Sequence, residues 1–280
     1  NVSQEIDFEE KTELVYDNVY SVEFNEPKRP IEISEVKIDS NIGFEHEKQL
    51  LELLNNYRDC FALNIAELGC TELIKMDIKE KEGSKPVCMK PYRTNAQERV
   101  DIANIVKEWK QNGIVSETRS PYASPVMLVK KKTGENRLVV DYRRLNSQTI
   151  KDKFPLPRID DLLERLQDCE LFTTLDLAHG YLQIPLTEEA KLKTAFITAD
   201  ETGQFERMIF GLANAPAEFQ RLMYRALGTL VNKDVLCYLD DILIPAKNWE
   251  EMMTKLTKVF EALRLANLTL KLARCEFAKK

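Results

Sequence analysis

The chain has 280 residues and a formal net charge of −6; 44% of its residues are hydrophobic and 31% are charged. This length allows one large domain or two smaller ones with a substantial core. The sequence has no apolar run of about 18 residues and no signal peptide, which argues against a membrane protein. Its six cysteines form no CxxC pair, so we expect no zinc site, and reduced thiols of a cytosolic or nuclear protein are favoured over disulfides.

Charge and hydrophobic pattern both change along the chain. Residues 1–60 hold six basic and fifteen acidic residues, whereas residues 85–160 hold sixteen basic and eight acidic ones. Residues 1–45 show no sustained hydrophobic period and are predicted to form a linker or arm. A short amphipathic helix is expected from His46 to Tyr57. The basic middle of the chain favours a polyanionic partner, with a solvated basic surface as the alternative.

A helix and a hairpin are predicted within this basic middle. The helix runs from a candidate capping box at Thr94 and Gln97 to the Asn-Gly pair at 112–113. Two apolar runs, at 124–129 and 137–142, then flank a Lys-rich turn that contains glycine. This pattern predicts a β-hairpin with a cationic tip, and the arginines that follow the tip add phosphate-binding capacity.

The second half of the chain alternates between predicted strands and helices. A proline-containing connector at 154–157 precedes a helix at 159–166. Asp176 lies at the end of the strand predicted at 171–177, where a lone acid is most often a turn former or a helix cap. The remaining expected elements are a hairpin at 194–198 and 205–210 with its turn at 201–203, a helix that starts at Pro216, and a helix at 249–266.

Two adjacent carboxylates, Asp240 and Asp241, interrupt the apolar run VLCYLDDILI at 235–244. The apolar residues on both sides predict two short buried strands, so the acids are expected at the turn of a hairpin or at a strand end. Like charges in such surroundings repel each other, and burial adds to the cost. A divalent cation, above all Mg²⁺, is therefore the favoured partner, with a solvated Asp-Asp turn as the alternative.

The order of these elements predicts an α+β fold of the ferredoxin-like type, in which helices back an antiparallel sheet. In such a sheet the end of the strand at 171–177 would bring Asp176 beside Asp240 and Asp241. Three converging carboxylates could hold two divalent ions about 3.5–4 Å apart, which in polymerases activate a hydroxyl for in-line displacement. Lys131 and Arg137 at the hairpin tip would then clamp a triphosphate.

Five blocks of the sequence carry a family resemblance. They are LVVDYRRLN at 138–146, FPLPRID at 154–160, FTTLDLAHGYLQIPL at 172–186, FGLANAPAEFQRLM at 210–223 and YLDDIL at 238–243. In this order and with this spacing the blocks resemble the reverse transcriptase of long-terminal-repeat (LTR) retrotransposons of the Ty3/gypsy kind. One block alone would be weak, because Asp-Asp turns also occur in other palm-type polymerases and in cyclases. The segments YRDCFA and ELGCTELI, within 57–74, resemble the stretch that links protease and polymerase in that family.

The resemblance implies a role for each matching position. Asp176, Asp240 and Asp241 would be the catalytic carboxylates, and together with the carbonyl of Leu177 they would bind two Mg²⁺ ions, with Mn²⁺ as the alternative. Tyr181 matches the aromatic gate that excludes a ribose 2′-hydroxyl. The implied substrate-binding residues are Lys131, Arg137, Tyr181, Phe210, Gly211, Tyr238 and Leu239.

The resemblance also implies an architecture and a set of partners. It divides the chain into an acidic arm at 1–45, a connecting segment at 46–84, fingers at 85–150 and 185–214, and an incomplete palm at 151–184 and 215–280. The thumb would be absent. Expected partners are an RNA or DNA template with its primer, deoxynucleoside triphosphates, and downstream thumb, connection and ribonuclease H parts of a polyprotein. The expected location is a cytoplasmic virus-like particle or the nucleus, with no membrane partner.

The leading hypothesis is an RNA-directed DNA polymerase, a nucleotidyltransferase that acts as a segment of a retrotransposon Pol polyprotein. The alternative is a catalytically incomplete, nucleic-acid-binding relic of the same kind of element. The three retained acids Asp176, Asp240 and Asp241 argue against long decay. A nucleotide cyclase or an RNA polymerase on a similar palm is disfavoured by Tyr181 at the gate position.

Overall fold

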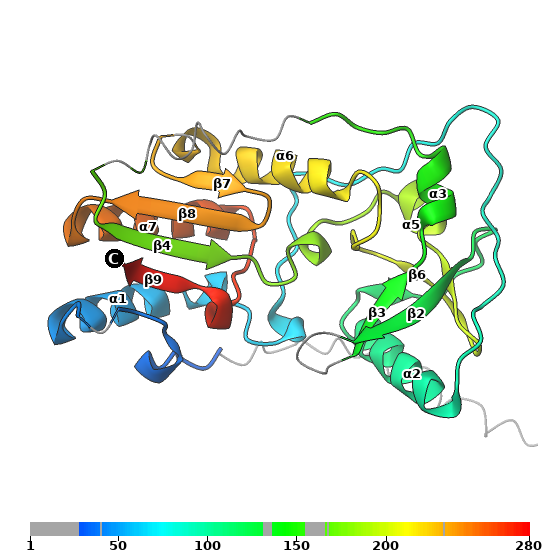
Figure 1. Cartoon of the computed structure of the whole chain (residues 1–280), viewed down its shortest axis with the longest axis horizontal. Coiled ribbons are helices and arrows are strands. Elements are labelled where there is room, and N and C mark those ends of the chain that lie inside the picture. The colour runs from blue at the N-terminus through cyan, green and yellow to red at the C-terminus, as the bar shows by residue number, and fades with distance from the viewer. Residues whose placement is uncertain (1–27, 40, 131–135, 155–165, 167, 232) are drawn as a thin grey trace, which may run out of the picture.

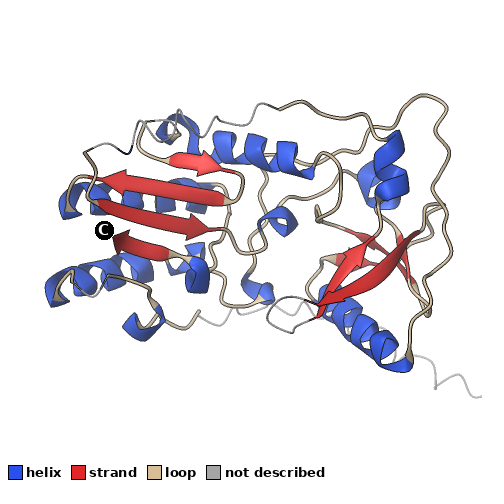
Figure 2. Ribbon diagram, in the orientation of Figure 1, coloured by secondary structure: helices blue, strands red, loops and turns tan. Residues whose placement is uncertain are grey.

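The molecule has two lobes, each built around one β-sheet (Figures 1 and 2). The computed structural model describes residues 28–39, 41–130, 136–154, 166, 168–231 and 233–280. None of the helices in these ranges has the length and apolar character that a membrane crossing requires. The helix predicted at 159–166, except for its last residue, and residues 155–157 of the connector before it fall outside the described residues.

The first lobe contains a four-stranded antiparallel sheet with the order β7-β8-β4-β9. Its strands are β4 (Leu171–Asp176), β7 (Leu236–Tyr238), β8 (Asp241–Ala246) and β9 (Glu276–Lys279). Along the chain the elements follow the order β4, α6, β7, β8, α7, β9. This is the ferredoxin-like arrangement. The α+β fold class predicted from the sequence is confirmed.

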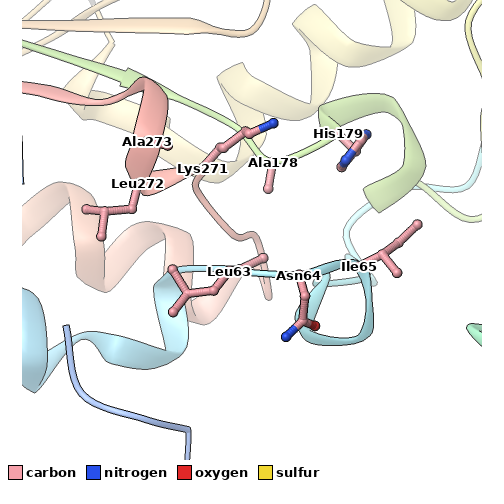
Figure 3. A pocket seen from close by; sticks show the side chains of 9 residues that line it. Leu63, Asn64, Ile65, Ala178, His179, Lys271, Leu272 and Ala273 are labelled. Carbon is pink, nitrogen blue, oxygen red and sulfur yellow. The ribbon is translucent and has the colours of Figure 1, made fainter. Parts of the chain in front are cut away.

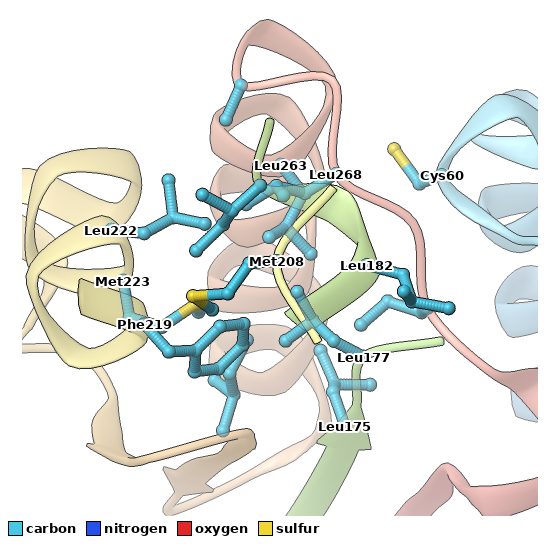
Figure 4. Close-up of a cluster of buried hydrophobic side chains, with 14 of the residues drawn as sticks. Cys60, Leu175, Leu177, Leu182, Met208, Phe219, Leu222, Met223, Leu263 and Leu268 are labelled. Atoms are coloured by element: carbon cyan, nitrogen blue, oxygen red, sulfur yellow. The ribbon is translucent and has the colours of Figure 1, made fainter. Parts of the chain in front are cut away.

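Two amphipathic helices pack on this sheet. Helix α6 spans Ala215–Leu227 with a proline in its first turn, and α7 spans Trp249–Leu265. Asn248 caps α7, because its side chain accepts the backbone N–H of Glu251 at 2.9 Å. The apolar sides of both helices meet the sheet in one buried cluster, shown in Figure 4, whose labelled members are Cys60, Leu175, Leu177, Leu182, Met208, Phe219, Leu222, Met223, Leu263 and Leu268.

Residues 28–39 and 41–62 pack against the same lobe. Helix α1 (Phe44–Asn56) packs beside α7, so the predicted amphipathic helix is confirmed and begins two residues earlier than expected. The ring of Phe61 lies 5.6 Å from the ring of Phe260 in an edge-on contact. Ile38 forms a parallel bridge with Phe277 of β9 and covers that edge of the sheet. This N-terminal segment is therefore part of the core.

The second lobe contains a five-stranded sheet with the order β1-β6-β5-β2-β3. Strands β2 and β3 form the predicted antiparallel hairpin, whereas β5 pairs with β2 in parallel. The strands are β1 (Val115–Ser116), β2 (Ser124–Lys130), β3 (Asn136–Val140), β5 (Phe196–Ile197) and β6 (Thr202–Phe205). The helices of this lobe are α2 (Ala96–Gln111), α3 (Arg143–Gln148) and α5 (Glu188–Lys193).

Two local predictions in this lobe are wrong. Asn95 rather than Thr94 caps α2: its side chain accepts the N–H of Glu98 at 2.8 Å, and the Glu98 carboxylate accepts the N–H of Asn95. The capping box exists, one residue later than expected. Gly203 lies in β6 instead of in a turn, and a Cβ there would stand 2.6 Å from Cζ of Phe196. Glycine is needed at this position to let a buried ring pack against the strand.

Candidate active site at the end of the four-stranded sheet

The two adjacent acids lie where the hairpin of β7 and β8 turns. Tyr238 and Asp241 pair across the hairpin, which leaves Leu239 and Asp240 as a two-residue loop. Tight hairpin loops of this length need a positive φ at their first residue, and Leu239 has a φ of 53°. The predicted hairpin turn is confirmed. The sequence departs from the usual glycine or asparagine there, so a leucine is held in the left-handed region.

Asp176 lies directly opposite this turn. Strand β4 pairs with β8 so that Asp176 faces Asp241. Burial raises the pKa of Asp241, and the negative charges of Asp240 and Asp176 raise it further. Burial also raises the pKa of Asp176, although Arg274 pulls it down. Asp176, which is distant in sequence from the adjacent Asp240 and Asp241, is thus close enough to both for the three acids to repel one another.

The chemistry of this cluster suits a hard divalent cation, because its side-chain donors are carboxylate oxygens. Within the described ranges, however, no group of three or more His, Cys, Asp or Glu side chains is arranged so that it could hold a metal ion. Asp176 and Asp241 face each other across two strands, while Asp240 occupies the turn. Leu177 is buried directly after β4. Metal binding by Asp176, Leu177, Asp240 and Asp241 therefore stays a prediction.

Arg274 is a member of the site that sequence reasoning missed. Its Nη1 donates to Oδ2 of Asp176 at 3.3 Å, from a position 98 residues later in the chain. Arg274 lies near the end of β4 because Lys271, three positions earlier, donates its backbone N–H to the Asp176 carbonyl at 2.9 Å. No spacing or period in the sequence marks Arg274. Only the approach of the segment before β9 to the end of β4 reveals it.

Three of the predicted pocket residues, Arg137, Phe210 and Tyr181, stack in this order against the buried ring of Phe219. The rings of Tyr181 and Phe210 lie 4.4 Å apart, and Tyr181 lies 5.3 Å from Phe219 of α6. The guanidinium carbon of Arg137 stands 4.4 Å above the Phe210 ring, a cation–π contact. Gly180 has no room for a side chain, because a Cβ there would lie 2.8 Å from Cζ of Phe219. The structure therefore brings Arg137, Tyr181 and Phe210 together.

Hydrogen bonds from α3, a helix of the second lobe, hold the loop that follows Phe210. Gly211 has a φ of 99°, which favours glycine. Asn146 donates from Nδ2 to the Gly211 carbonyl at 2.7 Å and accepts the N–H of Ala213 at 2.9 Å. Sequence reasoning quoted Asn146 within a family block but gave it no role. Its side-chain amide fixes the bend that leads into α6.

The remaining predicted residues are placed as follows. Tyr238 is 38% exposed at the end of β7, beside the turn. Leu239 is partly buried in the turn itself. Lys131 falls in the sequence between β2 and β3 and lies outside the described residues. Roles in substrate binding for these residues stay predictions.

A cavity of about 130 Å³ adjoins the acidic end of the sheet (Figure 3). Its walls come from three segments that are far apart in the chain, at 62–65, 178–179 and 271–273. Figure 3 shows the Lys271 side chain close to Ala178 and His179, the residues that follow β4. A basic side chain, close enough to Asp176 to lower the pKa of that acid, thus lines a hollow beside the end of β4.

The chain is similar to known polyproteins. A family model described as reverse transcriptase (RNA-dependent DNA polymerase) matches residues 129–280. The chain is 39% identical over 257 residues to the retrovirus-related Pol polyprotein from transposon 297 of Drosophila melanogaster, covering 90% of this chain and 24% of that protein. It is 37% identical over 172 residues to the transposon Tf2-3 polyprotein of Schizosaccharomyces pombe, covering 61% of this chain and 13% of that protein.

Solved structures share the fold. A foamy viral protease-reverse transcriptase in complex with an RNA/DNA hybrid matches with a TM-score of 0.77 and 23% identity, over 88% of this chain and 32% of the other. The native Prototype Foamy Virus protease-reverse transcriptase matches with a TM-score of 0.75 and 26% identity, over 88% of this chain and 32% of the other. The palm-type polymerase fold expected from the resemblance is confirmed.

The matches agree with one another along the chain. The family model covers all of α6, the Asp240-Asp241 turn and β4. The chain spans about a quarter or less of the curated relatives described above. The resemblance carried by the five sequence blocks is confirmed: this chain belongs to the reverse transcriptase (RNA-dependent DNA polymerase) family, and its relatives are Pol polyproteins of LTR retrotransposons.

Proposed function

We propose that this chain carries the polymerase site of an RNA-directed DNA polymerase, which adds deoxynucleotides to a primer 3′-hydroxyl. The observation that carries the proposal is the pairing of Asp176 with Asp241 beside the Asp240 turn. Nucleotidyl transfer builds up negative charge on the attacking and leaving oxygens. A cluster of carboxylates that repel one another suits this chemistry once divalent cations join them.

Asp176, Asp240 and Asp241, with the Leu177 carbonyl, are the groups that would hold two Mg²⁺ ions, or Mn²⁺. Bound there, the ions supply Lewis-acid stabilisation of phosphate oxygens and a more acidic primer hydroxyl. Burial is the main cause of the raised pKa values of Asp176 and Asp241, and repulsion from the neighbouring carboxylates raises both further. Divalent cations would remove that repulsion.

The pocket beside the acids suits a nucleoside triphosphate. Arg137 brings a permanent positive charge to the Phe210 and Tyr181 rings, and a guanidinium binds phosphate oxygens well. Lys131, Gly211, Tyr238 and Leu239 complete the proposed set. The Tyr181 ring is packed against Phe219 and cannot move away freely, which suits a gate against a ribose 2′-hydroxyl.

Template and primer are the proposed macromolecular partners. The foamy viral structure with the same fold is in complex with an RNA/DNA hybrid. Residues 85–160 carry twice as many basic as acidic residues, sixteen against eight, which favours a polyanion. Downstream thumb, connection and ribonuclease H parts and a location in cytoplasmic particles or the nucleus belong to the same proposal.

Primer extension tests this function. A DNA primer on an RNA template is incubated with Mg²⁺, deoxynucleotides, and either the 280-residue chain or a version extended through the expected thumb. We expect Asp240→Asn to lower incorporation by roughly 10³-fold in whichever chain is active. The matched control is Asp234→Asn, an acid at the start of the same hairpin that pairs with Lys258 at 3.8 Å. Unchanged incorporation by a folded Asp240→Asn variant would refute the proposal.

The second candidate is a nucleic-acid-binding relic. It is favoured by the same basic segment, which does not need the acids to bind a polyanion. Salt-sensitive binding of template-primer, with no incorporation even by the extended chain, would establish it. Extension by the longer chain alone would instead mean that the site is intact and the shorter chain is an incomplete enzyme.

A further inference from the structure

Gln220 is a residue of α6 whose buried side-chain amide contacts the Leu239-Asp240 turn. It lies in the interior of α6 and has no exposed surface. Its Oε1 accepts the backbone N–H of Leu239 at 2.8 Å. Its Nε2 is buried and has no hydrogen-bond partner among the residues that the structure describes. An unpartnered buried donor is costly, so its retention calls for an explanation.

The orientation of this amide is fixed by its partner. Because Leu239 offers an N–H, only an acceptor can face it, and exchanging the two ends of the amide would bring two donors together. A hydrophobic side chain of similar volume would avoid the orphaned Nε2, and would fill the same space in the core. Core packing therefore does not require glutamine at 220. The contact with Leu239 does.

Leu239 is the residue of the turn that most needs support. Its φ of 53° lies in the left-handed region, which a leucine rarely adopts. Both of its peptide groups are held by buried side chains: Gln220 accepts its N–H, and the Cys237 thiol lies 3.7 Å from its carbonyl. Burial, together with the neighbouring acids, raises the pKa of Cys237 to about 12, so the thiol keeps its proton and can donate.

The same helix also supports the other half of the pocket. Phe219, the residue before Gln220, packs against Tyr181. Two consecutive positions of α6 thus contact the proposed nucleotide gate and the turn that carries Asp240. Because both contacts come from one rigid element, the distance between gate and acids is set by α6.

We propose that Gln220 is a positioning residue: it holds Leu239 in the left-handed conformation and so fixes Asp240 beside Asp176 and Asp241. The predicted effect on catalysis rests on the proposed polymerase function. The predicted support of the Leu239 turn by Gln220 does not depend on that function. The hydrogen bond to Leu239 accounts for a glutamine at this position, although its Nε2 has no partner among the described residues.

The experiment compares Gln220→Met with the matched control Gln97→Met. Gln97 is an exposed glutamine on α2 that hydrogen-bonds to Asp101. Amide hydrogen exchange is followed in the 280-residue chain. We expect Gln220→Met to speed exchange of the Leu239 amide by about tenfold, as for loss of one hydrogen bond, while the Ile242 amide in β8 keeps the wild-type rate. Gln97→Met should leave both amides unchanged.

Activity is then measured in the thumb-extended chain. We expect Gln220→Met to lower kcat for nucleotide incorporation by about tenfold and to leave the Kd for template-primer within about twofold of wild type. Three results would overturn the inference: wild-type exchange at Leu239, faster exchange throughout the sheet including Ile242, or unchanged kcat despite faster exchange at Leu239. No incorporation by the wild-type extended chain would refute the proposed function instead, and the exchange result would still decide whether Gln220 holds the turn.

Discussion

Gly180 offers a test of the pocket that uses shape alone. Its missing side chain makes room for Phe219, whose ring supports Tyr181. In Gly180→Ala the added methyl would stand 2.8 and 2.9 Å from two ring carbons of Phe219 and 3.5 Å from Cβ of Leu177. Phe219 has no exposed surface, so its ring cannot swing into solvent. The ring must shift within a filled core.

The expected cost follows from that overlap. Overpacking of this kind costs about 1–3 kcal/mol, and replacing glycine by alanine recovers about 0.4–1 kcal/mol by restricting the unfolded chain. A net loss of about 1–2 kcal/mol should lower Tm by roughly 2–8 °C in a chain of this size. Urea denaturation gives the free energy of unfolding, and differential scanning calorimetry gives Tm.

A double-mutant cycle identifies the cause. Phe219→Leu removes the ring carbons that the new methyl would meet, so Gly180→Ala should cost about 1 kcal/mol less in that background. The extended chain should also incorporate nucleotides more slowly in Gly180→Ala, because Tyr181 rests on the displaced ring. If the two substitutions are additive, or if Gly180→Ala leaves the free energy of unfolding unchanged, the packing argument is wrong.

Three further predictions concern the second lobe and the nucleotide pocket. Asp141 is buried and accepts two hydrogen bonds from the Arg143 side chain, so Asp141→Asn should lower the free energy of unfolding at pH 7 by about 1–2 kcal/mol. Arg143 holds the pKa of Asp141 below its usual range, so this stabilisation is present above pH of about 4 and is lost as pH falls further; denaturation from pH 3 to 7 should show the wild-type advantage shrinking toward acid, and a constant difference would contradict it. Tyr181→Ala should weaken discrimination against ribonucleotides at least about tenfold in single-nucleotide extension, whereas equal discrimination would remove Tyr181 from the gate. Phe210→Leu removes the ring beneath Arg137, a contact worth about 0.5–1 kcal/mol, so KM for deoxynucleotides should rise about two- to fivefold, and an unchanged KM would mean that Arg137 binds without this support.

Local chemistry was sufficient to predict the acidic turn. Asp240 and Asp241 stand in a run that is otherwise apolar, and adjacent charges in such a run need either a turn or a cation. The position of Asp176 opposite them also follows from the order of elements, because a ferredoxin-like sheet places its first and third strands side by side. The structure pairs β4 with β8 in this way.

Local chemistry was insufficient wherever two equivalent choices lay side by side. Thr94 and Asn95 are both good caps. The structure uses Asn95, whose side chain accepts the Glu98 N–H while the Glu98 carboxylate accepts the Asn95 N–H. Gly203 looked like a turn residue, but the packing of Phe196 places it in a strand. In both cases a contact, rather than a propensity, decides between neighbours.

The sequence by itself determined the family, the α+β order of elements and the three acids at the end of one sheet, because these depend on residue type and on order along the chain. Only the tertiary structure decided which groups support them. Arg274 reaches Asp176 across 98 residues, and the Gln220 amide reaches Leu239 across 19. Such contacts form only when strands and helices pack, and the residues around a single side chain do not predict which distant residue it will contact.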